Sequence, residues 1–329
     1  MESSGRPRFM KAVFLDTASM GSGINFSGIR ESVDDLVLYE YSSTADCIGR
    51  LNGAHIAISN KVALDAATLQ ALPLLKMICV TATGMNNVDL VAAQALGIAV
   101  RNVSAYGTAS VAQHTMMLML ALANRLPRYQ TDVRQGQWQQ SSNFCLQHHT
   151  TLQLEGKHLV IVGSGELGTR VAQLAAAFGM RVSFCARPGY EASDSRAALA
   201  DLAPEADVLS LHCPLNEHTL GLINHTLLQQ LKPGCLLINC ARGGLVDDQA
   251  ALDALTGGSL GGYGVDVLPQ EPPRNGHILL DALTLPLNLM VTPHNAWITP
   301  EARQTLIDKT VLNLRQFRQP GYCRKVDKS

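Results

Sequence analysis

The stretch KHLVIVGSGELGTRVAQLAAAFGMRVSFCARPG, residues 157–189, decides the fold of this chain. Residues 158–162 form a short apolar run with the length and β-branched content of a buried parallel strand. A helical run follows to residue 178, and residues 181–185 have the pattern of a second strand. The stretch therefore predicts a strand–helix–strand unit with a glycine-rich turn after its first strand.

Three glycines in this turn have the spacing G-x-G-x-x-G: Gly163, Gly165 and Gly168. The first permits a tight turn, the second lets a pyrophosphate approach the backbone, and the third lets helix and strand pack closely. The first helical turn, at Glu166 and Leu167, offers N–H groups and a positive dipole end to phosphates. The motif alone is weak, but its place between a strand and a helix favours a dinucleotide site over a turn without ligand.

Composition limits the class of protein. A length of 329 residues predicts two domains, and 47% hydrophobic residues are enough for large cores. The net charge is −1 and there is no basic tract, so we expect no nucleic-acid partner. The longest apolar stretch, residues 115–123, is too short to span a bilayer, so we expect no membrane partner.

The eight cysteines are scattered, with no C-x-x-C pair and no Cys/His metal-ligand spacing, so we expect no metal site. Several fall inside predicted core strands, which indicates reduced, buried thiols and a cytoplasmic location. The first residues, MESSGRPRF, contain no apolar run, so we expect no signal peptide.

The first part of the chain alternates predicted strands and helices, which is typical of a parallel sheet with helices on both faces. The strand candidates are residues 11–16, 36–41, 55–60 and 76–81, and the helix candidates are residues 61–71 and 88–96. Residues 81–89 (TATGMNNVD) should lie at the carboxyl edge of this sheet, where Gly84 could present backbone N–H groups to an anion. The alternative is a solvent loop without a ligand.

The rest of the chain predicts a helix over residues 109–126, ended by Pro127, and then a polar segment, residues 128–150. This segment is long for a connection, so we interpret it as an arm that reaches a partner, with a surface loop as the alternative. Further strands are predicted at 207–213, 235–240, 264–268 and 289–292, and helices at 217–231, 247–255 and 300–317. With the two strands of the glycine-rich unit, this gives the six strands of a full dinucleotide-binding fold.

Polar residues follow the late strands: Arg242, Asp266, Glu271 and His294. Each taken singly has a structural explanation, but together at one edge of a sheet, beside a dinucleotide, they indicate a site. Hydride transfer to a carbonyl carbon needs a proton on the oxygen, and histidine, with a usual pKa of roughly 6.5, is suited to supply it. A carboxylate favours the imidazolium, and a guanidinium can bind a substrate carboxylate through two parallel bonds. The set predicts a 2-oxo or 2-hydroxy acid substrate.

At this point the chain resembles the D-2-hydroxyacid dehydrogenase family, and within it the glycerate dehydrogenase or hydroxypyruvate reductase branch. The motifs that carry the resemblance are TATGMNNVDL, YGTASVAQHT, VGSGELG, LHCPL, INCARGGLVDD, GVDVL, QEPP and VTPHNAW. The resemblance implies two doubly wound parallel-sheet α/β domains. A Rossmann domain would span residues 104–296, and a smaller flavodoxin-like substrate domain would comprise residues 1–103 and 297–329.

The resemblance also implies roles for single residues. His294 would be the general acid and base, Glu271 its hydrogen-bonded partner, and Arg242 the group that binds the substrate carboxylate. The backbone at Thr83 and Gly84 would also hold that carboxylate. Trp297 would wall the substrate pocket or, equally well, serve as a core or interface residue.

For the cofactor, the resemblance implies that Asp266 anchors the nicotinamide amide, together with carbonyls near Cys240 and Ala241. The residues that would flank the cofactor are Thr108, Cys213 and Pro214. The resemblance further implies a homodimer through the dinucleotide domain, in which residues 128–150 serve as the dimer arm.

The choice between NAD and NADP depends on the end of the second strand of the glycine-rich unit. Residues 185–187 are Cys, Ala and Arg, so the acid that would bind a ribose 2′-hydroxyl is missing there. Arg187 could hold a 2′-phosphate, which slightly favours NADP, or it could stack or face solvent in a site that accepts both.

A second function, from a different class, is a dinucleotide-sensing binding protein or corepressor on the same fold. The dinucleotide motif does not distinguish the two, because fold and motif are not activity. Retention of Arg242, Glu271 and His294 favours the enzyme.

Overall fold

The computed structural model describes residues 9–319, which pack as two compact units. One unit comprises described residues 9–107 and 298–319, and the other comprises residues 108–297. The expectations for the N-terminal tail, residues 1–8, and for Cys323 fall outside the described residues. None of the helices in the described part is both long enough and apolar enough to cross a membrane.

The first unit holds, in its described part, a five-stranded parallel sheet with the order β2-β1-β3-β4-β5. This is the 2-1-3-4-5 order of flavodoxin-like folds. Its strands are β1 (Lys11–Phe14), β2 (Asp35–Leu38), β3 (Ile56–Ser59), β4 (Met77–Val80) and β5 (Ala99–Arg101). Its helices are α1 (Ser27–Glu31), α2 (Cys47–Leu51), α3 (Ala66–Gln70), α4 (Leu90–Ala95) and α12 (Pro300–Arg318).

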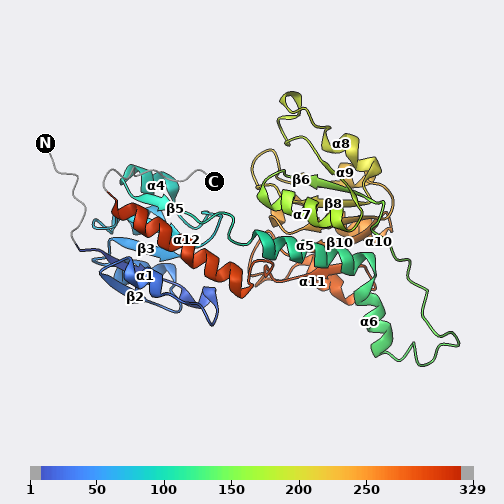
Figure 1. Cartoon of the computed structure of the whole chain (residues 1–329), viewed down its shortest axis with the longest axis horizontal. Coiled ribbons are helices and arrows are strands. Elements are labelled where there is room, and N and C mark those ends of the chain that lie inside the picture. Colours follow the sequence, from blue (N-terminus) through green and yellow to red (C-terminus); the bar gives the residue numbers. More distant parts are fainter. Residues whose placement is uncertain (1–8, 320–329) are drawn as a thin grey trace. The chain divides into compact units, whose positions relative to one another are not determined.

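The last helix returns to the first unit, where it lies beside α1 (Figure 1). Its start follows the prediction, since the Thr299 side chain accepts a hydrogen bond from Ala302 N at 3.3 Å and Pro300 occupies the first turn. The predicted helix over residues 61–71 is wrong in its first half. The Asp65 carboxylate accepts from Thr68 N at 2.8 Å and starts the helix there. Strand β5 and helices α1 and α2 were missed because each is too short to carry a periodic pattern.

The second unit, all of whose residues are described, holds a six-stranded parallel sheet with the order β11-β10-β9-β8-β6-β7. Its strands are β6 (His158–Val162), β7 (Arg181–Phe184), β8 (Val208–Leu211), β9 (Cys235–Asn239), β10 (Leu260–Val265) and β11 (Leu289–Val291). Its helices are α5 (Thr108–Ala123), α6 (Leu126–Arg134), α7 (Glu166–Ala177), α8 (Leu199–Leu202), α9 (His225–Gln230), α10 (Asp248–Thr256) and α11 (Ile278–Asp281). The order of the strands reverses between β6 and β8, where open α/β sheets bind ligands.

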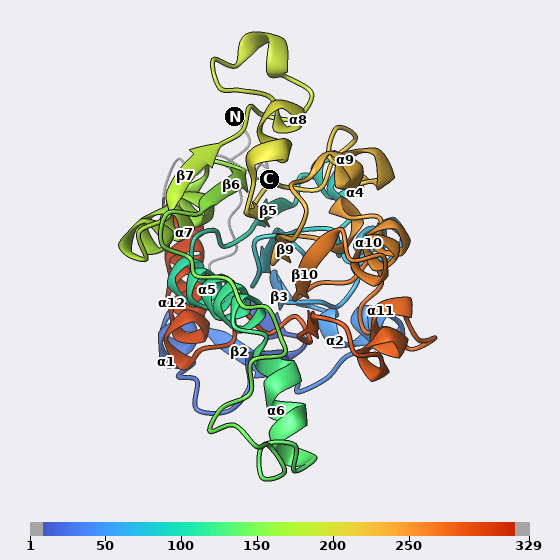
Figure 2. The same ribbon diagram turned by 90° about the vertical axis from the view of Figure 1, so that its right-hand side faces the viewer.

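Strand β6 shows why the strands of this unit carry mostly apolar residues on both faces. Leu159 and Ile161 pack toward α5 and α7, whereas Val160 and Val162 pack toward the core that contains α9 and α10. Figure 2 shows α5 and α7 together on one side of β9 and β10, with α10 and α11 on the other. Because successive side chains of a strand point to opposite faces, a sheet covered on both sides needs apolar residues without alternation.

The segment after α5 differs from its prediction. The helix ends at Ala123 rather than at residue 126, because Arg125 adopts a left-handed backbone conformation with φ of 55°. Pro127 does not end a helix but lies in the first turn of α6, where a missing N–H group costs nothing. Helix α6 and the loop after it extend away from the sheet of this unit (Figure 1).

Two further elements of the second unit were placed wrongly. The strand predicted at residues 264–268 is β10, which begins four residues earlier because its glycines are required by packing: a Cβ on Gly261 would lie 2.0 Å from Gly234 O. The helix predicted at residues 217–231 is only α9, because Asn224 caps it by accepting from Leu227 N at 3.1 Å.

A buried acid in this core leads to a prediction about stability. Tyr263 OH donates to Asp248 Oδ1 at 3.0 Å, and burial raises the pKa of Asp248 to about 6. The folded protein therefore binds this proton more tightly than the unfolded chain, and the Asp248 contribution to stability falls as pH rises from about 4 to 6. Asp248→Asn, which keeps an acceptor for Tyr263, is expected to raise the free energy of unfolding at pH 7.5 by about 1–3 kcal/mol. Denaturant unfolding at pH 7.5 and at pH 4 tests this, since the gain should vanish at the lower pH.

Candidate active site

His294 and Glu271 form the closest pair of functional groups at the carboxyl edge of the second unit's sheet. His294 follows β11 and Glu271 follows β10, and these strands are neighbours. His294 Nδ1 lies 2.5 Å from Glu271 Oε2, and the two side chains are 33% and 32% exposed. The second oxygen of the acid, Oε1, accepts from Leu268 N at 2.8 Å. The carboxylate is thereby fixed against the imidazole, and Nε2 is the ring nitrogen left for a substrate.

The loop that carries His294 is held from below by Asp266, which is 1% exposed. Its Oδ1 accepts from Thr292 Oγ1 at 2.5 Å and from Asn295 N at 3.0 Å, and its Oδ2 accepts from Ala296 N at 3.0 Å. His294 itself has φ of 52°, a left-handed conformation that is costly for a residue with a Cβ. These hydrogen bonds on both sides of His294 hold the loop in that conformation.

His114 and Thr292 help to hold the loop of His294, and sequence reasoning missed both. His114 Nε2 lies 2.9 Å from Thr292 Oγ1 and 3.5 Å from Asp266 Oδ1, and burial lowers the pKa of His114. A neutral ring donates through Nε2–H to the threonine, which donates in turn to the aspartate. The only signal in the sequence was a histidine directly before the apolar run of α5.

Arg242 follows β9 at the same edge of the sheet. Its turn is fixed by the fully buried Asn239, whose Oδ1 accepts from Ala241 N at 3.0 Å and whose Nδ2 donates to Arg242 O at 2.9 Å. The guanidinium is partly buried, and its Nη1 donates to Ala241 O at 2.7 Å. Asn239 was also missed, although an asparagine at the end of an apolar strand is the kind of residue that organises a turn.

The glycine-rich turn fits a dinucleotide. Gly163 has φ of 107°, and a Cβ there would lie 2.5 Å from His212 O. A Cβ on Gly168 would lie 2.0 Å from Gly163 O, whereas a Cβ on Gly165 would meet nothing within 4 Å. The turn is thus tight at its first and third glycines and open at the second, where a pyrophosphate must approach. Gly165 is also the N-cap of α7 and provides no side chain to bond the first N–H groups, which suits an anion.

Other residues predicted at the cofactor surround this turn. Thr108 Oγ1 donates to Glu166 Oε1 at 2.9 Å, which brings two of them together. Cys213 N would lie 2.9 Å from a Cβ on Gly163, so the start of the Cys213–Pro214 pair lies against the turn. Leu167, in the first turn of α7, is partly buried, and Cys240 and Ala241 are buried just after β9.

The choice between NAD and NADP was predicted to depend on residues 185–187, which follow β7. The first two of these, Cys185 and Ala186, carry no charge. Burial raises the pKa of Cys185 to about 12, so its thiol stays neutral. Arg187 is exposed, and its guanidinium carbon lies 4.2 Å over the centre of the Tyr190 ring. The carboxylate of Asp194 accepts a hydrogen bond from the backbone N of Arg187 at 2.9 Å and forms an ion pair with Arg196.

The remaining predicted residues are Thr83 and Gly84, in the first unit, and Trp297, in the second. Thr83 and Gly84 follow β4 in the first unit, where Thr83 Oγ1 donates to Val103 O at 3.1 Å. Trp297 is partly buried and is the last residue of the second unit.

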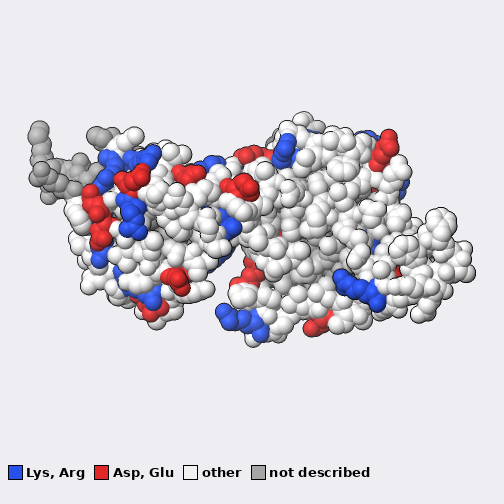
Figure 3. All heavy atoms as spheres, turned by 60° about the horizontal axis from the view of Figure 1, so that its bottom comes forward, with Lys and Arg blue, Asp and Glu red and all other residues white. Residues whose placement is uncertain are grey.

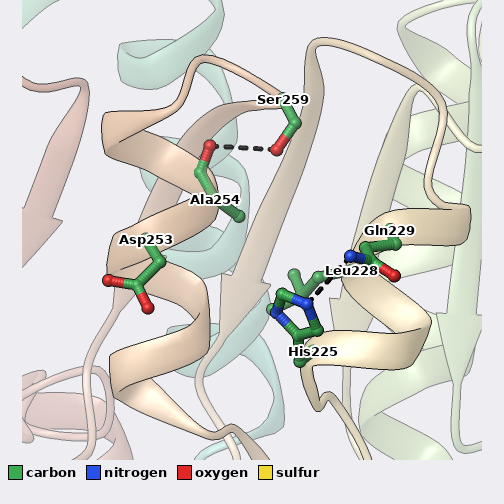
Figure 4. A pocket seen from close by; sticks show the side chains of 6 residues that line it. All are labelled: His225, Leu228, Gln229, Asp253, Ala254 and Ser259. Carbon is green, nitrogen blue, oxygen red and sulfur yellow. Dashed lines mark hydrogen bonds between the residues drawn. The ribbon is translucent and has the colours of Figure 1, made fainter.

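A hollow between α9 and α10, shown in Figure 4, contains none of the predicted site residues. It is lined by His225, Leu228, Gln229, Asp253, Ala254 and Ser259. Ser259 directly precedes β10, so this hollow lies at the amino edge of the sheet, opposite the edge that carries His294. In the face shown in Figure 3, basic and acidic side chains are interspersed rather than gathered into a patch.

Comparison with known proteins gives the family. Residues 116–296 match the NAD-binding domain of the D-isomer specific 2-hydroxyacid dehydrogenases. The chain belongs to this family. This 2-hydroxyacid dehydrogenase is 42% identical to the glycerate dehydrogenase of Methylorubrum extorquens over 311 residues, which cover 93% of this chain and 96% of the relative.

Two further relatives agree with this assignment. The hydroxypyruvate reductase of Blautia hydrogenotrophica is 32% identical over 97% of this chain and 100% of its own. A solved structure, the NADPH-dependent glyoxylate/hydroxypyruvate reductase of Sinorhizobium meliloti in complex with NADP and malonate, is 26% identical, with a TM-score of 0.77 and 95% and 94% of the two chains covered. The predicted fold class, family and enzyme class are confirmed: the chain is an oxidoreductase of 2-hydroxy acids that uses NAD(P).

Proposed function

We propose that this dehydrogenase reduces a small 2-oxo acid, of the hydroxypyruvate or glyoxylate type, to the D-2-hydroxy acid, with His294 as general acid. The observation that carries the proposal is the 2.5 Å contact between His294 Nδ1 and Glu271 Oε2 at the ligand-binding edge of the sheet. An imidazole held by a carboxylate, with its other nitrogen open, is suited to give a proton to a carbonyl oxygen and to take it back.

In this reaction each residue of the proposed site has a separate role. The bound nicotinamide supplies the hydride. His294 holds a proton at Nε2 and delivers it to the carbonyl oxygen of the substrate, and in the reverse direction Nε2 accepts the hydroxyl proton. Glu271 orients the ring through Nδ1 and stabilises its charged form. Asp266 fixes the loop of His294, and its assignment to the nicotinamide amide stays a prediction.

Arg242 binds the substrate carboxylate, and its guanidinium also polarises the carbonyl. The backbone groups at Thr83 and Gly84 are proposed to bind the same carboxylate. Trp297, three residues after His294, is proposed to limit the side chain of the substrate to one or two heavy atoms.

A substrate panel tests the proposed function. The names of the relatives, glycerate dehydrogenase and hydroxypyruvate reductase, support small substrates. Oxidation of NADH and NADPH is followed with hydroxypyruvate, glyoxylate, pyruvate and a branched 2-oxo acid. We expect kcat/KM to be highest for hydroxypyruvate or glyoxylate. A higher kcat/KM for the branched acid would contradict the proposed substrate class.

We also propose that NADPH is accepted and preferred, through Arg187. Stacking on Tyr190 leaves the guanidinium N–H groups available to a 2′-phosphate, and Asp194 is already paired with Arg196. Arg187→Ala is expected to lower kcat/KM for NADPH by about 10- to 100-fold, the value of a charge-assisted bond, and to change NADH use little. Arg181→Ala, at the other end of β7, is the matched control. A clear NADH preference that Arg187→Ala leaves unchanged would show that the cofactor assignment is wrong.

The arm is proposed to form a homodimer together with α5. Trp138 and Phe144, on the arm, are 54% and 89% exposed, so a partner subunit that packs on the arm would bury apolar surface. Sedimentation at micromolar concentration is expected to give twice the chain mass of 35.3 kDa. An active species that sediments only as a monomer would refute the dimer.

We further propose a reducing, cytoplasmic location. Six cysteines of the described part are buried, which supports thiols that remain reduced.

A further inference from the structure

Asp132, His148 and His149 lie together where the arm folds back on α6. Asp132 is in the last turns of α6, and the two histidines lie in the loop near the end of the arm. Nε2 of His148 and Nε2 of His149 lie 2.8 and 2.7 Å from the same oxygen, Asp132 Oδ2. The ligand atoms of all three residues lie within 4.8 Å of one another.

Packing holds the three side chains in this arrangement. The side chains of Asp132 and His149 are 11% and 7% exposed, whereas that of His148 is 44% exposed. The Tyr129 ring packs edge-on against His149 with centroids 4.8 Å apart, and its hydroxyl donates to His149 O at 3.1 Å. The cluster is thus fixed on one side by α6 and open to solvent on the side of His148.

The cluster is remote from the chemistry described above. Arg125, just before α6, donates from Nη1 to Gly261 O at the start of β10, so α6 leaves the unit at the amino edge of the sheet. His294 and the glycine-rich turn lie at the carboxyl edge. Neither the substrate nor the dinucleotide therefore accounts for two imidazoles directed at one carboxylate oxygen.

We propose that Asp132, His148 and His149 bind one divalent transition-metal ion, best Zn²⁺, with water from solvent at the fourth position. Two imidazole nitrogens and one carboxylate oxygen are a ligand set that suits Zn²⁺ and does not suit Mg²⁺ or Ca²⁺, which prefer oxygen alone. Tetrahedral ligands at about 2.0–2.1 Å from the ion lie roughly 3.4 Å from one another. To admit the ion, the two rings need to separate from the carboxylate oxygen by only about 0.6–0.7 Å, from 2.8 and 2.7 Å.

The ion joins α6 to the chain that returns from the arm, so its role is to fix the arm rather than to react. The sequence predicted no metal site because that search relied on Cys and His spacing. Here the first ligand is an aspartate, sixteen residues before the first histidine.

Zinc titration tests the proposal. The full chain, purified without a polyhistidine tag and dialysed against a chelator, is titrated with Zn²⁺ by calorimetry. We expect one tightly bound ion per chain. Loss of an outer-sphere partner alone weakens metal affinity about 10- to 100-fold, so His148→Ala, which removes a ligand, should weaken it at least tenfold. His225→Ala, an exposed histidine of α9, is the control and should bind as the wild type does.

Thermal unfolding gives a second readout that does not depend on calorimetry. Zn²⁺ is expected to raise the Tm of the wild type and of His225→Ala, and to raise that of His148→Ala and Asp132→Asn by clearly less. Reductase activity should persist after chelation, because the site lies at the opposite edge of the sheet. Equal Zn²⁺ affinity in the wild type and His148→Ala, or a Tm increase in His148→Ala as large as that of the wild type, would overturn the proposal. Mg²⁺ binding as tight as Zn²⁺ binding would overturn the assigned class of ion.

Discussion

Replacing His294 with alanine is expected to lower kcat for 2-oxo acid reduction by about 100- to 10,000-fold, the usual contribution of general acid catalysis. Glu271 holds the imidazole in place at this edge, so loss of the ring leaves the carbonyl oxygen without this oriented proton donor. Steady-state kinetics with hydroxypyruvate and NADPH measure the effect.

The fold should survive this change. His294 is one-third exposed, and the bonds that fix its loop run from Asp266 to Thr292, Asn295 and Ala296 rather than to the imidazole. A Tm near that of the wild type would therefore accompany the loss of activity. His225→Ala is the matched control and should retain full kcat. Turnover near the wild-type value in His294→Ala would eliminate this residue as the acid.

Arg242→Ala is expected to produce the second large effect, a fall in kcat/KM of about a hundredfold or more that appears mainly in KM. Each hydrogen bond to a charged group contributes roughly 1.5–3 kcal/mol, and the guanidinium can make two to a carboxylate. Arg242→Lys keeps the charge but loses the planar fork, so it should recover only part of the loss. The KM for the 2-oxo acid in all three proteins measures this.

The result that would contradict this role is equally defined. An unchanged KM for the 2-oxo acid in Arg242→Ala would show that another group binds the carboxylate. Because the guanidinium also donates to Ala241 O, Tm values are needed to separate a binding defect from a disturbed turn after β9.

Much of the fold follows from local sequence. Strand β6 has the predicted bounds because its five residues, four of them apolar, are all buried, and Gly163 and Gly168 are recognisable because no other residue fits beside His212 O and Gly163 O. The start of α12 was equally local, since Thr299 and Pro300 define it. These features depend on contacts between residues close in sequence or on steric limits of single residues.

Other features depend on tertiary contacts and could not be predicted. Nothing near Pro127 shows that it begins α6 rather than ending α5, and β10 contains glycines because Gly234 O packs against it. Strand β5, with three residues, is defined by its pairing with β4 and not by its own pattern.

The candidate site divides in the same way. The placement of His294 and Glu271 at one edge was expected because the carboxyl ends of parallel strands meet there, and their pairing was implied by the resemblance. The left-handed backbone of His294 and the bonds from Asp266 that sustain it were not, since they join residues up to 30 positions apart. The resemblance assigned Asp266 to the cofactor and gave no sign that this acid also positions the loop of the histidine.

The most direct test of the central claim, that His294 and Glu271 act as one proton-transfer pair, is kcat for hydroxypyruvate reduction in the wild type, His294→Ala, Glu271→Gln and the double variant. Residues that act as a unit have strongly non-additive effects on turnover. Once the imidazole is removed, Glu271→Gln should therefore cost little further activity. Losses that multiply in the double variant would contradict the account.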